Sequence, residues 1–107
     1  MDSEKALYLG LMSGTSADGI DAALVRFADG KPRLQAAHNL PWPEDLRAQI
    51  LTLAQSDAPL DLDTFGRLDV RIGHCLADAA LALLQHSGTA PGDVRAIGSH
   101  GQTMRHR

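Results

Sequence analysis

The chain has 107 residues, the length of one small domain with a single modest core. Hydrophobic residues make up 44% of it, charged residues 21% and aromatic residues 4%, which is typical of a globular α/β protein with an aliphatic core. A net charge of -3 argues against a nucleic-acid partner. The single cysteine excludes an internal disulfide. Neither a secretion signal nor a membrane-spanning apolar run is visible. We therefore expect a cytoplasmic protein.

Three strands are predicted first. Leu7 to Met12 are nearly all apolar, which predicts a central strand buried on both faces. A second apolar stretch runs from Ile20 to Phe27, and the Asp29-Gly30 pair that follows is typical of a hairpin turn. Pro32 to Leu40 then predict a third strand. Together the three strands would form an antiparallel meander.

Two helices follow the strands. Pro43 begins the first, and Glu44 and Asp45 fall in its first turn, where the helix dipole favours anions. Apolar residues spaced by three or four positions from Asp61 to His86 predict a longer second helix, with Gly88 as its C-terminal cap. Its core-facing stripe is predicted to consist of Leu62, Phe65, Leu68, Ile72, Leu76, Ala79 and Leu83.

A short last strand is predicted from Val94 to Gly98, followed by a polar turn from Ser99 to Thr103 with the sequence SHGQT. The resulting order, β-β-β-α-α-β, places the last strand beside the first and parallel to it, because a long helical crossover joins them. The two polar turns of the chain would then leave neighbouring strands at their carboxyl ends. Ligands bind at that edge in open α/β sheets.

The first polar turn, Ser13 to Gly19, has the sequence SGTSADG. Its glycines allow backbone amides to converge and its hydroxyls add donors, which suits an anion such as phosphate. No Walker loop or nucleophile elbow is complete here, and a plain hairpin rich in Gly and Asp is the structural alternative. Asp18 and Asp21 could orient a hydrated magnesium ion, or serve only as a turn residue and an exposed strand residue.

The second polar turn carries His100, Gln102 and Thr103, whose donors and acceptors suit a sugar. A capped turn without a ligand is the alternative. His74 and Cys75 lie within the long helical pattern, where packing explains them better than a metal site does.

Two stretches, LGLMSGTSADGIDAALV and IGSHGQTMRHR, closely resemble the N-terminal signatures of the anhydro-N-acetylmuramic acid kinase family. The resemblance runs from about Leu7 to Arg107. It implies an actin/hexokinase-like (ribonuclease H-like) fold of two lobes, of which this single domain, residues 1–107, is the incomplete first. It also implies ATP and Mg²⁺ as cofactors and an amino sugar as substrate. Family enzymes open the anhydro ring of anhydro-N-acetylmuramic acid with water and phosphorylate its O6, which yields N-acetylmuramic acid 6-phosphate in cell-wall recycling.

The resemblance also implies roles for particular residues. We expect His100 and Gln102 to face the sugar. Met12 stands where related sugar kinases of the wider superfamily carry an aspartate, which argues against metal contact from that strand end. The residues expected to contact ATP are Gly14, Thr15, Ser16, Ala17, Asp18, Gly19, Ile20 and Asp21.

The resemblance places the family's catalytic aspartate and its second lobe beyond Arg107. We therefore expect this chain to be inactive alone and marginally folded, and the full-length enzymes to be homodimers. The residues leave two rival functions open. A non-catalytic nucleotide-binding or assembly module would keep the sheet without the chemistry, and a small hydrolase would use Ser16 and His100 but lacks the elbow that such a nucleophile needs.

Overall fold

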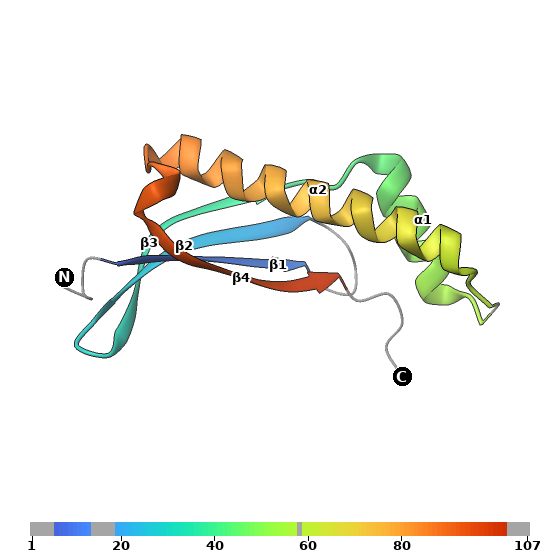
Figure 1. Cartoon of the computed structure of the whole chain (residues 1–107), viewed down its shortest axis with the longest axis horizontal. Coiled ribbons are helices and arrows are strands. Elements are labelled where there is room, and N and C mark those ends of the chain that lie inside the picture. The colour runs from blue at the N-terminus through green and yellow to red at the C-terminus, as the bar shows by residue number, and fades with distance from the viewer. Residues whose placement is uncertain (1–5, 14–18, 58, 103–107) are drawn as a thin grey trace.

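Four strands form one mixed sheet, and two helices pack on one of its faces (Figure 1). The structure is a computed structural model that describes residues 6–13, 19–57 and 59–102. The elements in chain order are β1 (Leu7–Ser13), β2 (Ile20–Ala28), β3 (Lys31–Leu40), α1 (Glu44–Gln55), α2 (Leu62–Ser87), a 3-10 turn (Pro91–Asp93) and β4 (Val94–Gln102). This order confirms the predicted β-β-β-α-α-β arrangement.

The strands are arranged in the order β3-β2-β1-β4. β2 pairs antiparallel with both β1 and β3, whereas β4 runs parallel to β1, as predicted from the helical crossover. Asp29 and Gly30 have φ angles of 54° and 75°, which a tight hairpin turn of type I′ requires at both central positions. The meander and its turn are therefore confirmed.

The core lies between the sheet and the helices. It is aliphatic apart from Trp42, as the composition indicates. The prediction that β1 is buried on both faces is wrong: Met12 is 56% exposed, because both helices cover the same face and leave the other open. The buried apolar residues are Leu9, Leu11, Ile20, Ala22, Leu24, Trp42, Leu46, Ile50, Leu68, Ile72, Ala79, Ala80, Leu83 and Leu84.

Helix α2 is capped at both ends, and the C-terminal cap at Gly88 is the one that the sequence predicts. The Asp61 carboxylate accepts a hydrogen bond from the Thr64 amide at 2.8 Å, and Gly88 ends the helix in the left-handed conformation with φ 70°. The predicted apolar stripe fails at its beginning, where Leu62 is 82% and Phe65 48% exposed. Figure 1 shows the reason, because this end of α2 extends past the end of the sheet.

Strand β4 is longer than predicted. Ser99 pairs with Leu11 and Gln102 pairs with Ser13, so the segment predicted as a polar turn continues the strand to Gln102. The pairing shifts register between Leu11 and Ser13, next to Gly101 with φ 80°. Backbone pairing with β1 therefore prevails over the local turn signal. In the described part of the chain, neither helix is long and apolar enough to cross a membrane.

Candidate functional site

The candidate site is the connection between β1 and β2, together with the end of β4 beside it. Ser13 is the last residue of β1 and Ile20 the first of β2. Ser13 and Gly19 are therefore the described residues at the two ends of the connection. The contacts that they make define the site. The predicted ATP contacts Gly14, Thr15, Ser16, Ala17 and Asp18 lie outside the described residues.

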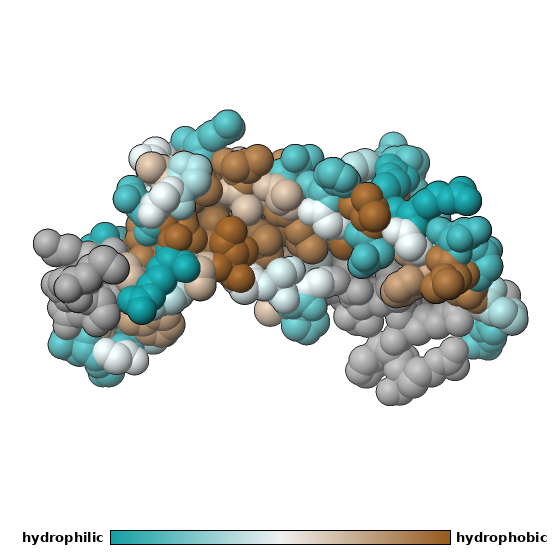
Figure 2. All heavy atoms as spheres, viewed as in Figure 1, coloured by the Kyte–Doolittle hydropathy of each residue, from teal (hydrophilic) through white to brown (hydrophobic). Residues whose placement is uncertain are grey.

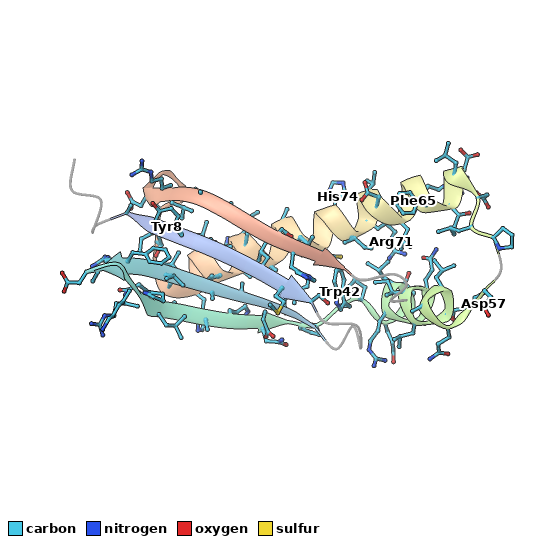
Figure 3. All side chains as sticks on the ribbon, turned by 90° about the horizontal axis from the view of Figure 1, so that it is seen from below. Tyr8, Trp42, Asp57, Phe65, Arg71 and His74 are labelled. Carbon is cyan, nitrogen blue, oxygen red and sulfur yellow. The ribbon has the colours of Figure 1, made fainter. Side chains whose placement is uncertain are left out.

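The entry to this connection is fixed by a buried hydrogen bond. Trp42, between β3 and α1, donates from Nε1 to Oγ of Ser13 at 3.0 Å. Ser13 is 1% and Trp42 5% exposed, so water does not compete for this bond. Figure 3 shows Trp42 at the end of β1 near α1. The point where the chain leaves β1 is thus tied to the core.

The exit is packed against β3. A Cβ atom placed on Gly19 would lie 2.9 Å from Oδ1 of Asn39, closer than side chains approach, so the residue-19 backbone and the Asn39 amide are in close contact. Asn39 also donates from Nδ2 to Oδ1 of Asp21 at 2.8 Å. Asp21 and Asn39 are direct partners in the β2–β3 register. One amide side chain therefore orients Asp21 and lines Gly19.

Two neighbouring residues of the predicted site point to opposite faces of the sheet. Ile20 is fully buried in the core, so only its main chain is available to a ligand. Asp21 is exposed on the open face, and its β1 partner in the register is Met12. The Asp21 carboxylate therefore lies where a ligand could reach it, on the face that the helices leave uncovered.

The end of β4 lies beside this connection. Gln102 is the register partner of Ser13, and His100 is exposed. The prediction that β1 and β4 bring their carboxyl ends to the same edge is confirmed, although residues 99–102 belong to β4 itself rather than to a turn after it. The Gln102 side chain and Thr103 lie outside what the structure describes.

The comparison with known families decides which family the chain resembles. The family model described as anhydro-N-acetylmuramic acid kinase matches residues 6–107. The chain belongs to the anhydro-N-acetylmuramic acid kinase family. A relative of that name from Xanthomonas campestris pv. campestris (strain 8004) is 53% identical over 104 residues, which are 94% of this chain and 28% of the relative.

Two further members of the anhydro-N-acetylmuramic acid kinase family show the same pattern. The protein from Xanthomonas axonopodis pv. citri (strain 306) is 50% identical over 107 residues. The aligned region covers 97% of this chain and 29% of the Xanthomonas protein. The protein from Vibrio vulnificus (strain CMCP6) is 47% identical over 105 residues. These are 98% of this chain and 28% of the Vibrio protein. The chain therefore spans less than a third of the length of the kinases that it matches.

A metal ion bound directly at the β1–β2 connection would need a set of ligand side chains. Among the described residues, no group of three or more His, Cys, Asp or Glu side chains could hold a metal ion. Among the described residues Asp21 places a carboxylate near Gly19, and this carboxylate accepts a hydrogen bond from the Asn39 amide. At this site Asp21 could thus contact a hydrated ion through water, but the described side chains offer no direct ligand set.

Asn39 and Trp42 were not predicted to belong to the site. Asn39 lies near the end of β3, and Trp42 lies in the connection from β3 to α1. The available signals were weak: Trp42 is the only tryptophan and stands between Pro41 and Pro43, and Asn39 is a polar residue near a strand end. Their contacts with Ser13, Gly19 and Asp21 depend on tertiary placement, which local patterns do not encode.

Proposed function

We propose that this chain supplies the phosphate-binding part of an ATP-dependent anhydro-N-acetylmuramic acid kinase. In the complete enzyme, this activity converts 1,6-anhydro-N-acetylmuramic acid to N-acetylmuramic acid 6-phosphate. The observation that carries the proposal is the β1–β2 connection, whose two ends are held by Trp42 and Asn39 in a chain of this kinase family. The fold that we propose for the lobe is actin/hexokinase-like.

The residues present fit a phosphate ligand. Gly19 leaves room for the Asn39 side chain, which an added Cβ would displace, so at this position the main chain rather than a side chain faces the site. Phosphate oxygens accept hydrogen bonds from backbone amides, and Gly14, Thr15 and Ser16 add further amides and two hydroxyls to the same connection. ATP, when bound, supplies the phosphoryl group that is transferred to the sugar.

Within this proposal, each described residue has a separate task. Asp21 holds a water of the hydrated Mg²⁺ through its carboxylate, which the Asn39 amide keeps oriented. Ile20 contributes only main-chain contacts, because its side chain belongs to the core. His100, exposed on β4 beside the end of β1, lies on the sugar side together with Gln102.

We further propose that the 107 residues bind without turnover. Phosphoryl transfer depends on positioning and on charge stabilisation from several sides, so a site formed from one side gives little rate. The chain spans 28% of the Xanthomonas campestris kinase, and we place the base that activates water in the remaining part. Incubation of the pure chain with ATP, Mg²⁺ and the anhydro sugar should release no ADP. Sugar-dependent ADP release would contradict this statement.

The binding step can be tested by NMR. We would titrate the ¹⁵N-labelled chain with Mg²⁺-ATP and, as a matched control, with adenosine, which has the base and ribose but no phosphates. We expect selective shifts of the Gly14, Thr15, Ser16 and Gly19 amides with ATP and none with adenosine. Equal shifts with adenosine would contradict phosphate recognition. A dispersed spectrum that ATP leaves unchanged would contradict binding by this chain.

A further inference from the structure

A single segment, Asn39 to Trp42, contacts both ends of the β1–β2 connection. Trp42 holds Ser13 at the entry, and Asn39 holds Gly19 and Asp21 at the exit. We propose that this segment, called here the 39–42 clamp, fixes the two ends of the connection relative to each other and so positions the phosphate-binding backbone. Asn39 and Trp42 are then positioning residues. The proposal deepens the proposed function and rests on it for the identity of the ligand.

The entry contact is suited to a positioning role because it is buried and directional. The Trp42 indole has one N–H, and that group donates to Ser13 Oγ at 3.0 Å inside the core. A buried hydrogen bond of this kind is costly to break, since the freed polar groups cannot turn to water. Ser13 is therefore held at a fixed place next to the start of the connection.

The exit contact couples three residues through one amide. The Asn39 side chain cannot swing away from Gly19 without losing its 2.8 Å bond to Asp21. A side chain at position 19 would displace it, because the added Cβ would lie 2.9 Å from Asn39 Oδ1. The backbone at Gly19 and the carboxylate of Asp21 are thus set by the same group.

The segment between the two contacts is itself stiff. Pro41 and Pro43 fix their own φ angles, and the residue before each proline is restricted to extended conformations. Pro43 adopts φ -53° and ψ 137°, and α1 begins at the next residue with Leu46 and Ile50 buried in the core. The spacing between the two contacts is therefore fixed by proline geometry and anchored by α1.

A fixed spacing lowers the cost of binding. Ligands that order a backbone segment lose affinity to the entropy of ordering it, whereas a preorganised segment avoids part of that cost. Removing the contact at either end should therefore make the ends of the connection more mobile and lower its affinity for phosphate. If Trp42 or Asn39 had only a structural role, its substitution would instead lower the stability of the whole core uniformly.

Two variants separate these roles. Trp42→Phe keeps an aromatic ring in the core and removes the N–H donor, and Asn39→Ala removes the amide at the exit. The matched control is Gln35→Ala on the same strand, whose side-chain amide donates to the nearby Arg33 carbonyl at 3.1 Å, away from the β1–β2 connection. The double variant Asp21→Asn with Asn39→Asp reverses donor and acceptor and should restore the exit bond.

The first readout is amide hydrogen exchange of the ligand-free chain under conditions where circular dichroism shows it folded. We expect about fivefold faster exchange at Ser13 in Trp42→Phe and at Gly19 and Asp21 in Asn39→Ala, the effect of losing one hydrogen bond. Exchange within α2 should stay unchanged, Gln35→Ala should have no effect, and the double variant should recover slow exchange. Unchanged rates at the ends, or rates that rise together with those of α2, would overturn the clamp.

The second readout is the Mg²⁺-ATP titration of the same variants. If the wild-type chain binds, Trp42→Phe and Asn39→Ala should each weaken binding about fivefold while Gln35→Ala does not. Binding of equal strength in all of them would overturn the clamp. If the wild-type chain does not bind, the proposed function fails for this chain, and the exchange rates alone decide the clamp.

Discussion

Ile20 and Asp21 are neighbours in the chain, and their side chains lie on opposite faces of the sheet. Side chains alternate along a strand, so the residue after a core position faces outward. Ile20 is fully buried, and Asp21 presents its carboxylate on the open face beside Asn39. Substitution of Ile20 therefore tests the core, whereas substitution of Asp21 tests the site.

Cys75 allows a prediction about a single thiol on α2. Partial burial, and then the nearby negative charge of Asp78, raise the pKa of this thiol above its ordinary value of 9.0. The thiolate is the reactive form, so the folded chain holds less of it at a given pH. We expect iodoacetamide to alkylate Cys75 severalfold more slowly in the folded chain than in urea at about pH 8.

The Asp78 contribution can be isolated by substitution. Asp78→Asn removes that charge and should speed alkylation of folded Cys75, whereas Asp69→Asn, on the same helix but not among the groups that shift this pKa, should not. Equal rates in the folded and unfolded chain would contradict the effect of burial. Equal rates in the two variants would contradict the part assigned to Asp78.

Helix α2 begins at a charged cap, which makes part of its stability dependent on pH. The hydrogen bonds from the Thr64 amide and hydroxyl lower the pKa of Asp61 below its ordinary 3.8. This stabilisation is fully present above the unfolded value and is lost as the pH falls through the lower folded value. We expect Asp61→Ala to lower the Tm by a few degrees at neutral pH.

Asp61→Asn separates the cap from its charge. Asparagine caps a helix about as well as aspartate, so this variant should keep most of the neutral-pH Tm and lose part of the acid dependence. The Tm of each variant would be followed by circular dichroism from about pH 2 to pH 5. Asp63→Asn, also in the first turn but without the capping bond, is the control. The same acid dependence in Asp61→Asn and the wild type would contradict this origin.

Local signals explain why most elements were predictable. The turn at Asp29-Gly30 and the cap at Gly88 act on their own neighbours, and each has its expected conformation. The extension of β4 to Gln102 depends on pairing with β1, so the sequence SHGQT alone indicated a turn. Such non-local contacts also explain why Trp42 was not predicted as part of the site.

The same distinction applies to burial. Apolar periodicity predicted the stripe of α2 well where the helix lies on the sheet, and Leu68 and Leu83 are buried. It failed at Leu62, because periodicity shows which face of a helix is apolar but not how far its partner extends. The wrong prediction that β1 is buried on both faces has the same cause. An apolar run does not show whether one or two layers will pack on the strand.

The whole molecule is extended for its length. Its radius of gyration is 15.8 Å and its extents are 50 × 27 × 22 Å, whereas a compact domain of this size has a radius of about 13 Å. Helix α1 and the start of α2 reach past the sheet, and one face of the sheet is open (Figure 1). The two layers therefore cover each other only in part.

This partial cover leaves an apolar groove between α2 and β4, whose lining includes Leu81, Leu84 and Ile97. Figure 2 shows apolar side chains gathered in this part of the molecule. Ile97 is 57% exposed on a strand that has a partner on only one side. Exposed apolar surface of this kind binds the dye ANS, so we expect the folded chain to enhance ANS fluorescence.

Ile97→Lys should lower that enhancement at least about twofold, because it places a charge in the groove at a position already open to water. Met12→Lys is the matched control, since Met12 is 56% exposed but lies on a central strand outside the groove lining. A loosened core would also bind ANS, and the near-ultraviolet circular dichroism of buried Trp42 would reveal it. An equal loss of ANS fluorescence in both variants, with the Trp42 signal intact, would show that the groove is not the exposed apolar site.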